Sequence, residues 1–273
     1  MLPLLVMTAT PIIRPLQLVW QSYVVTFRGL DTILRLSWFA ALLLAIVGRI
    51  VSGELPESVA GTETETLPAS YMLVFSILAI VTAMVHAMVA VGWHRAILRD
   101  EHQENRRIYF RLGRNELLYT VAAVFLMVFV MMAVSIVPMV WTSSGADPVS
   151  MTVAMVMGPG LVLMLVGRSL LVLPAIAIGR GADLALSWRA TSGQVFRVAA
   201  VLALMVVPLG LIDLAIIEIV TSVAERDLGV VLNMLASFVV TTVLIVMVST
   251  IVSAASLLYR ELVDPLTDPR VFD

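Results

Sequence analysis

The sequence contains no cysteine and no lysine, and only 13% of its 273 residues are charged. The absence of cysteine excludes disulfides, thiolate zinc sites, iron–sulfur clusters and cysteine nucleophiles. The absence of lysine makes every cationic side chain an arginine, and it excludes a Schiff-base mechanism. Since charged residues make up about 25% of an ordinary soluble domain, the scarcity of charge also argues against a soluble fold.

Apolar residues, by contrast, make up 60% of the sequence, and its mean hydropathy is +1.03. A helix needs about 20 predominantly apolar residues to cross a bilayer, and the stretches between charged residues supply several of that length. We therefore predict one integral membrane domain over 1–273, an all-α polytopic bundle of six transmembrane helices. The expected spans are about 33–52, 71–93, 117–141, 153–178, 197–220 and 228–259.

The arginines indicate how the spans are oriented. They concentrate before the first span, between the second and third, between the fourth and fifth, and after the sixth, whereas the other gaps contain only Arg226. Because cytoplasmic loops are enriched in cationic residues, we expect both termini in the cytoplasm. Tryptophans at or near the span ends fit the aromatic belts of membrane interfaces: Trp38, Trp93, Trp141 and Trp188.

The segment before the first span separates polar from apolar side chains. One side of a helix would carry Arg14, Gln17, Gln21, Arg28, Asp31 and Arg35. The other side would carry Leu18, Trp20, Val25, Phe27 and Leu34. This spacing predicts an interfacial amphipathic helix over 14–35. A helix that docks a partner protein is the alternative.

Three aromatic–arginine pairs, each ahead of an odd-numbered span, point to an internal repeat: Phe27-Arg28, Phe110-Arg111 and Trp188-Arg189. They are 83 and 78 residues apart, which divides the chain into three units of a surface helix followed by a transmembrane hairpin. Any cytoplasmic interface selects the same residue pairs without a repeat, so both interpretations stay open.

An arginine-rich stretch follows the second span. We expect the second helix to continue as a solvated extension after Leu98. The arginines between 95 and 114 are expected to contact anionic lipid, such as cardiolipin or phosphatidylglycerol, since each cation near such a surface contributes about 1 kcal/mol. No nucleic-acid partner is expected, and a membrane protein is the other class of partner. The residues predicted to contact lipid headgroups are Arg95, Arg99, Arg106, Arg107, Arg111 and Arg114.

Two charged residues lie deep within predicted spans, Arg168 in the fourth and Asp213 in the fifth. An unpaired charge at that depth costs at least about 2.5–3.5 kcal/mol on insertion scales. Both residues lie near the middle of their spans, and side chains lean toward the N-terminus of their own helix. We therefore predict an intramembrane ion pair between them. Such a pair is either a structural link between two helices or a gating or proton-coupled site.

Smaller polar side chains also occur inside the spans. His86 lies about two turns inside the end of the second span, as a neutral imidazole bonded to a neighbouring helix or as a proton relay. Ser249, Ser253 and Ser256 follow helical spacing in the sixth span. Small side chains at this spacing let the backbone of another helix approach closely, so we predict a packing seam there.

Several motifs carry a resemblance to a known bacterial group. Ser187-Trp188-Arg189-Ala190-Thr191-Ser192-Gly193 opens a turn after Arg168 and Leu173-Pro174-Ala175, and Leu258-Tyr259-Arg260-Glu261-Leu262 closes the sixth span. This order of elements resembles the six-helix membrane region attached to some glycerophosphodiester phosphodiesterases, and its uncharacterised stand-alone relatives. The resemblance implies a bacterial inner-membrane bundle of no settled function, without the separate soluble domain that carries the enzyme activity.

Signatures of hydrolases and nucleotide-binding enzymes are missing, since the sequence contains no G-x-S-x-G elbow, no H-E-x-x-H pair and no P-loop. We therefore predict no catalytic site, no cofactor and no metal site. The sequence favours a non-enzymatic accessory or scaffold protein that contacts lipid or a membrane partner. A transporter of lipid or of a small solute is the alternative.

We predict that reporter fusions will place both termini on the cytoplasmic side, because the arginines concentrate in the gaps on that side. A reporter that works only in the periplasm should be active when fused at Glu63, and a reporter that works only in the cytoplasm should be active when fused at Asp273. A periplasm-active fusion at Asp273, or a cytoplasm-active one at Glu63, would contradict this topology.

Overall fold

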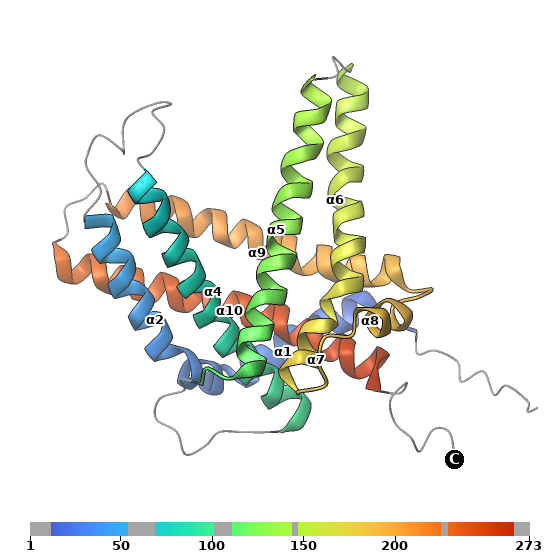
Figure 1. Ribbon diagram of the computed structural model, residues 1–273, viewed down its shortest axis with the longest axis horizontal. Helices are drawn as coiled ribbons and strands as arrows, with labels where there is room; N and C mark the ends of the chain where they lie inside the picture. Colours follow the sequence, from blue (N-terminus) through green and yellow to red (C-terminus); the bar gives the residue numbers. More distant parts are fainter. Residues whose placement is uncertain (1–11, 54–68, 101–110, 144–146, 225–228, 265–273) are drawn as a thin grey trace, which may run out of the picture.

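A computed structural model describes residues 12–53, 69–100, 111–143, 147–224 and 229–264, and these residues fold into helices and short connections (Figure 1). Within these ranges, 6 segments are long and apolar enough to cross a membrane. The predicted all-α bundle of six membrane-spanning helices is therefore confirmed, and the chain is a multi-pass membrane protein. The helices are α1 Pro15–Arg28, α2 Leu30–Gly53, α4 Ala69–Arg99, α5 Arg114–Ser143, α6 Pro148–Leu170, α7 Val172–Ala177, α8 Leu184–Ala190, α9 Val195–Ala224 and α10 Val230–Leu262.

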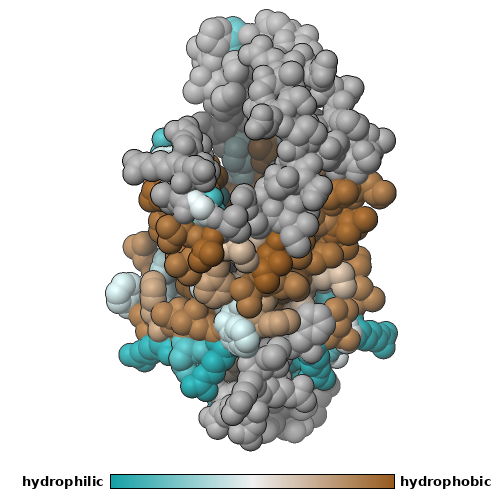
Figure 2. Space-filling view, turned by 90° about the vertical axis from the view of Figure 1, so that its left-hand side faces the viewer, coloured by the Kyte–Doolittle hydropathy of each residue, from teal (hydrophilic) through white to brown (hydrophobic). Residues whose placement is uncertain are grey.

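The helices converge at one end of the molecule and diverge at the other. We call the converging end the base: α4, α7 and α10 end there, α2, α5 and α9 begin there, and α1 and α8 lie beside them. Figure 1 shows α5 and α6 rising together from the base while α9 and α10 run in another direction. In a side view, hydrophilic residues lie below an apolar band, at the base (Figure 2). The bundle is therefore splayed rather than parallel.

α10 is the central helix of the base, where it packs against α1, α2, α4, α7 and α9. The predicted seam is confirmed, because Ser249, Ser253 and Ser256 are buried beside the buried Ala254 and Ala255. Each serine hydroxyl donates to the carbonyl a turn earlier in the helix, which satisfies the hydroxyl locally. Small side chains along α10 thus let several helices approach its backbone.

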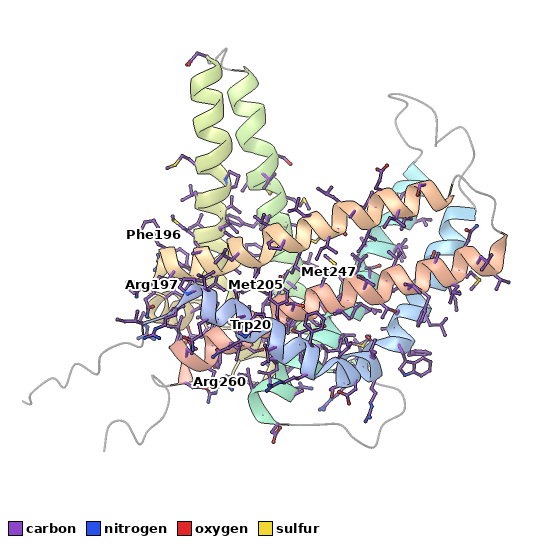
Figure 3. The ribbon with its side chains drawn as sticks, turned by 180° about the vertical axis from the view of Figure 1, so that it is seen from behind. Trp20, Phe196, Arg197, Met205, Met247 and Arg260 are labelled. Atoms are coloured by element: carbon purple, nitrogen blue, oxygen red, sulfur yellow. The ribbon has the colours of Figure 1, made fainter. Side chains whose placement is uncertain are left out.

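α1 lies across α9 and α10 (Figure 3) and docks through a narrow face. Its buried residues are Leu18, Ser22 and Thr26, and the Thr26 hydroxyl lies 2.9 Å from the Ser253 hydroxyl. Leu18 therefore packs against protein, whereas Trp20 from the same predicted apolar side is 69% exposed. The single helix predicted over 14–35 is corrected to two helices, because the chain turns between α1 and α2.

Two of the three surface helices that the predicted repeat requires are seen in the part of the chain that the structure describes. α1 precedes α2, and α8, which contains Trp188 and Arg189, precedes α9. The segment that would correspond to them before α5 includes Phe110 and lies outside the described residues. The repeat therefore stays a prediction.

α4 continues beyond the predicted end of its span, to Arg99. The residues just after the predicted end of the span are buried, since His94 is 0% exposed and Arg95 is 5% exposed. Trp93 is likewise buried rather than placed at the membrane surface, and its indole N–H donates to Ser253 Oγ at 2.8 Å. The indole ring lies against Gly29, where a Cβ atom would fall 2.2 Å from the ring. Trp93 thus joins α4 to α10 and to the turn between α1 and α2.

We expect Gly29→Ala to destabilise the protein, because the added Cβ meets an indole ring that burial and the bond to Ser253 hold in place. Overpacking of this kind costs about 1–3 kcal/mol, which thermal unfolding in detergent measures. Gly48→Ala in α2 is the matched control, since a Cβ there meets nothing within 4 Å and should cause no loss. Equal stability of the two variants would contradict the close approach of Gly29 and Trp93.

Candidate functional site

A cavity of about 620 Å³ lies between α4, α5, the α6–α7 junction and α10. It extends along α4 from Phe75 to His94, which at 1.5 Å per residue corresponds to about 28 Å. At the diverging end of the bundle its lining residues Phe75 and Met127 are exposed, whereas His94 and Tyr119 are buried at the base. The cavity is therefore open where the helices diverge and closed at the base.

Small side chains on one face of α4 leave the space for this cavity. Ala79, Ala83, Ala87 and Ala90 follow one another at intervals of three or four residues, so they share one side of the helix. All of them line the cavity, and Ala123 lines it from α5. The helices are held together at the base, and side chains this small do not fill the gap above it.

A directed chain of hydrogen bonds forms the floor of the cavity. His94 contacts the Ser256 hydroxyl through Nδ1 at 2.7 Å and the Tyr119 hydroxyl through Nε2 at 3.2 Å. Because the Ser256 hydroxyl donates its single proton to the carbonyl of Val252, Ser256 Oγ accepts from the Nδ1–H of His94. Nε2 then accepts the proton of the Tyr119 hydroxyl. The imidazole therefore has a partner at both ring nitrogens.

His86 is the other imidazole on the cavity wall, about two turns from His94 along α4. Its Nδ1 lies 2.8 Å from the carbonyl oxygen of Thr82, one turn earlier in the same helix. A carbonyl only accepts, so Nδ1 carries a proton. Because no carboxylate lines the cavity to balance an imidazolium, the uncharged ring is favoured there, and it presents the lone pair of Nε2. The bond predicted to reach a neighbouring helix is thus made within α4. Among the described residues, Nε2 of His86 has no partner.

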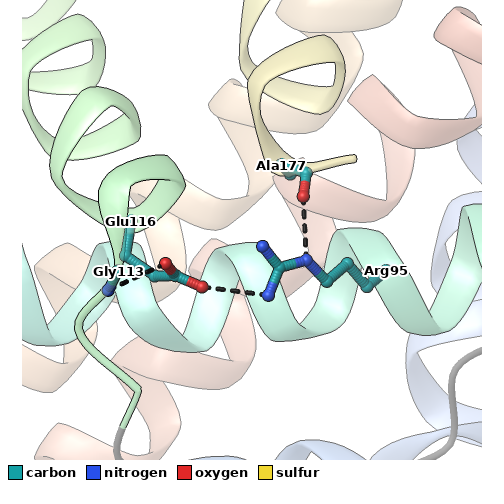
Figure 4. A network of polar contacts seen from close by, with 4 residues as sticks. All are labelled: Arg95, Gly113, Glu116 and Ala177. Carbon is teal, nitrogen blue, oxygen red and sulfur yellow. Dashed lines mark hydrogen bonds and ion pairs between the residues drawn. The ribbon is translucent and has the colours of Figure 1, made fainter. Parts of the chain in front are cut away.

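A buried ion pair closes the base next to His94 (Figure 4). Arg95 Nη1 donates to Glu116 Oε1 at 2.9 Å, and only 6% and 2% of the two side chains are exposed. Arg95 Nε donates to the carbonyl of Ala177 at 2.8 Å. Glu116 Oε2 accepts from the backbone N–H of Gly113 at 3.0 Å. The guanidinium group therefore joins the end of α7 to the first turn of α5.

Helix ends supply the groups that hold this pair. Glu116 lies in the first turn of α5, where a carboxylate that bonds back to the backbone N–H ahead of the helix stabilises the helix start. The chain leaves α7 through Gly179, whose φ of +79° suits glycine. Arg95 and Arg99 donate to the two carbonyls just before that glycine, and these carbonyls have no partner further along the helix.

A second ion pair attaches the connection between α7 and α8 to the end of α10. Arg180 donates to the Tyr259 hydroxyl at 3.1 Å and to Asp264 at 3.0 Å. The hydrogen bond to Tyr259 raises the pKa of the Arg180 guanidinium above its ordinary value. The side chains of Arg180 and Asp264 are 45% and 41% exposed, so water weakens their attraction and the pair contributes little to stability.

The arginines predicted to contact lipid headgroups differ in their surroundings. The prediction is wrong for Arg95, because its side chain is buried in the ion pair with Glu116. It stays a prediction for three that are exposed at the base, Arg99, Arg111 and Arg114. Two others lie outside the described residues, Arg106 and Arg107.

The predicted ion pair between Arg168 and Asp213 is wrong. Arg168 Nη2 donates to the backbone carbonyl of Trp188 at 3.2 Å, and its guanidinium carbon lies 4.2 Å from the centroid of the Trp188 ring. This contact fastens α8 to the end of α6. Asp213 forms no ion pair with Arg168 or with any other described residue.

The reason is the register of α6 against α9. A Cβ on Gly167 would lie 2.9 Å from Val198 and 3.3 Å from Leu202, so α6 meets α9 close to where α9 begins. Asp213 lies eleven residues beyond Leu202, a distance of about 16 Å along the helix. α6 and α9 also diverge over this distance (Figure 1). Arg168 in α6 therefore lies beside the beginning of α9 rather than beside Asp213 in its middle.

The sequence does not reveal the residues that close the site, because the predicted second span ends at Trp93, just before His94 and Arg95. One signal does point to them. Gly113 followed three residues later by Glu116 has the spacing of a helix start with a back-bonding carboxylate. That spacing places an anion where α5 begins, close to where α4 ends.

Comparisons with protein-family models, with curated protein sequences and with solved structures returned no match for this chain. The resemblance to the membrane region of glycerophosphodiester phosphodiesterases therefore stays a prediction. The function is proposed from the cavity, its polar floor and the ion pair that closes the base.

We expect Arg95→Met and Glu116→Leu each to lower the free energy of unfolding strongly, because each leaves a buried charge without its partner. Removing one member of a buried pair costs about 3–5 kcal/mol. The double variant leaves no unpaired charge, so its loss should be smaller than the sum of the two single losses. Thermal unfolding in detergent gives all three values.

The matched control breaks an exposed pair. Arg35 lies 3.6 Å from Asp31 in α2, and the two side chains are 65% and 63% exposed. Exposed pairs of this spacing contribute about 0.3–0.5 kcal/mol, so Arg35→Met should be nearly neutral. Single variants at Arg95 or Glu116 that cost no more than Arg35→Met would refute the buried pair.

Proposed function

We propose that this chain is a non-enzymatic accessory protein of a bacterial inner membrane, with both termini in the cytoplasm, which binds lipid inside its bundle. The observation that carries the proposal is the apolar cavity between α4, α5, the α6–α7 junction and α10. The cavity is open where the helices diverge, within the apolar band of the molecule. A lipid chain therefore enters it from the membrane without crossing water.

The dimensions of the cavity suit a hydrocarbon chain. Its volume of about 620 Å³ lies within the range of about 300–1,000 Å³ that is typical of sites for small molecules. A helix of a partner protein, about 10 Å in diameter, would occupy about 2,200 Å³ over the length from Phe75 to His94. Mainly apolar walls with a few placed polar groups are typical of sites for small molecules. These dimensions support a lipid chain rather than a docked helix as the occupant.

The base is proposed to face the cytoplasm and to contact anionic lipid headgroups. Exposed arginines come together there from several helices, and Figure 3 shows Arg197 at the start of α9 and Arg260 at the end of α10. Arg99, Arg111 and Arg114 add to them from α4 and α5. This distribution agrees with the enrichment of cations on the cytoplasmic side, and cations beside the membrane attract anionic lipid.

A transporter of lipid or of a small solute is the second candidate, because a cavity open at one end is also one state of an alternating-access cycle. Transport would require the base to open. The buried pair of Arg95 and Glu116 opposes this opening, since separating such a pair without new partners is strongly unfavourable. The closed base therefore supports a lipid-binding protein over a transporter.

Filling the cavity tests the proposal. Ala83→Phe puts a large side chain on the α4 wall of the cavity, and Ala215→Phe puts the same side chain on the exposed surface of α9. Each variant is purified from bacterial membranes, and the lipids that remain bound are quantified by mass spectrometry. We expect a several-fold loss of bound lipid in Ala83→Phe and the wild-type amount in Ala215→Phe.

Thermal unfolding of both variants shows whether they are folded before their lipids are compared. A folded Ala83→Phe variant that keeps the wild-type amount of every bound lipid would contradict the proposal. An equal loss in Ala215→Phe would also contradict it, because the lipid would then bind to the outer surface rather than in the cavity.

A further inference from the structure

We infer that the cavity recognises a neutral lipid that carries a hydroxyl group, and that Nε2 of His86 accepts the hydrogen bond from this hydroxyl. The inference rests on the proposed function, because it names the class of ligand for the same cavity. It depends on two properties of His86: its depth in the span and the atom that its ring presents.

His86 lies in the middle of the apolar segment of α4. It is thirteen residues from each end of the membrane-spanning range Leu73–Arg99, or about 20 Å along the helix. No Asp or Glu lines the cavity, so a cationic headgroup would find no opposite charge there. A phosphate headgroup at this depth would be buried without a cation, which is strongly unfavourable. The polar group that meets His86 is therefore uncharged.

The bond from Nδ1 to the Thr82 carbonyl determines what His86 recognises. With the proton on Nδ1, the neutral ring offers only an acceptor at Nε2. The two nitrogens lie on different edges of the ring, so Nε2 points away from the Thr82 carbonyl. A ligand must supply a donor to meet it. A hydroxyl supplies one, whereas the oxygens of esters and ethers only accept.

The other imidazole on the cavity wall, at the closed end, already has its partners. His94 uses both ring nitrogens, one toward Ser256 and one toward Tyr119. An apolar cavity holds water poorly, so a bound water is a weak competitor for Nε2. A lipid hydroxyl therefore donates the hydrogen bond to Nε2 of His86 that none of the described residues donates.

The test compares straight-chain probes of equal length that differ at one end. Hexadecan-1-ol carries a donor, pentadecyl methyl ether carries only an acceptor, and heptadecane carries neither. Radiolabelled probes are bound to the full chain in nanodiscs, and protein-free nanodiscs correct for partition into lipid. One hydrogen bond changes affinity about two- to tenfold. We expect this preference for the alcohol over the ether in the wild type, and no preference in His86→Leu.

Ala215→Phe on the exposed surface of α9 is the control, since it changes no residue of the cavity and should keep the preference for the alcohol. Nitrogen NMR gives a second measurement, because the chain contains only 3 histidines. Addition of hexadecan-1-ol should shift the Nε2 resonance of His86 and leave the resonances of His94 unchanged.

Equal affinity of the wild type for the alcohol and the ether, or an unchanged preference in His86→Leu, would overturn the inference. The lipid-binding function would still hold if Ala83→Phe abolished binding of both probes. Absence of saturable binding for every probe would refute the proposed function as well. A competition experiment adds one more outcome. If phosphatidylglycerol displaced hexadecan-1-ol from the wild type but not from His86→Leu, the inference would also be overturned, because His86 would then recognise a charged lipid.

Discussion

Inside a membrane-embedded bundle, a buried polar group depends on partners from the protein, because the hydrocarbon core of the bilayer supplies none. Ser253 shows how this constraint organises the base. Its hydroxyl accepts from the Trp93 indole, contacts the Thr26 hydroxyl, and donates to a carbonyl of α10 itself. One small side chain thus connects α4 and α1 to the central helix. The burial of Trp93, its contact with Gly29 and the turn between α1 and α2 all depend on this connection.

The same constraint explains why the helices diverge away from the base. The buried pair of Arg95 and Glu116 and the hydrogen bonds of His94 all lie at the base. Beyond them, α4 and α5 present mainly alanine and other apolar side chains, which pack against lipid as readily as against protein. The helices therefore separate where polar contacts end, and the cavity lies in that separation. His86 projects into it from the part of α4 that lacks such contacts.

Length and hydropathy are enough to predict the six spans, since crossing a bilayer requires an apolar run whatever the helices pack against. The serine seam is predictable for a similar reason, because its spacing defines one face of one helix. Contacts between helices depend on tilt and register, which packing sets. The spacing of residues along the chain does not reveal that α6 meets only the beginning of α9. The predicted pair of Arg168 and Asp213 fails for this reason.

Both arginines that the sequence misplaces donate to backbone carbonyls near helix ends. Arg95 donates to Ala177 at the end of α7, and Arg168 donates to Trp188 in the last turn of α8. The last carbonyls of a helix lack partners within it, and a cation beside them is favourable. Asp213 is the carboxylate that the predicted spans offer to Arg168, whereas Glu116 lies just before the predicted third span, so the sequence does not pair it with Arg95. The short helices α7 and α8 provide backbone carbonyls as acceptors, and residue type does not indicate these acceptors in the sequence. Arg95 and Arg168 bind these carbonyls and so attach the short helices to the longer ones.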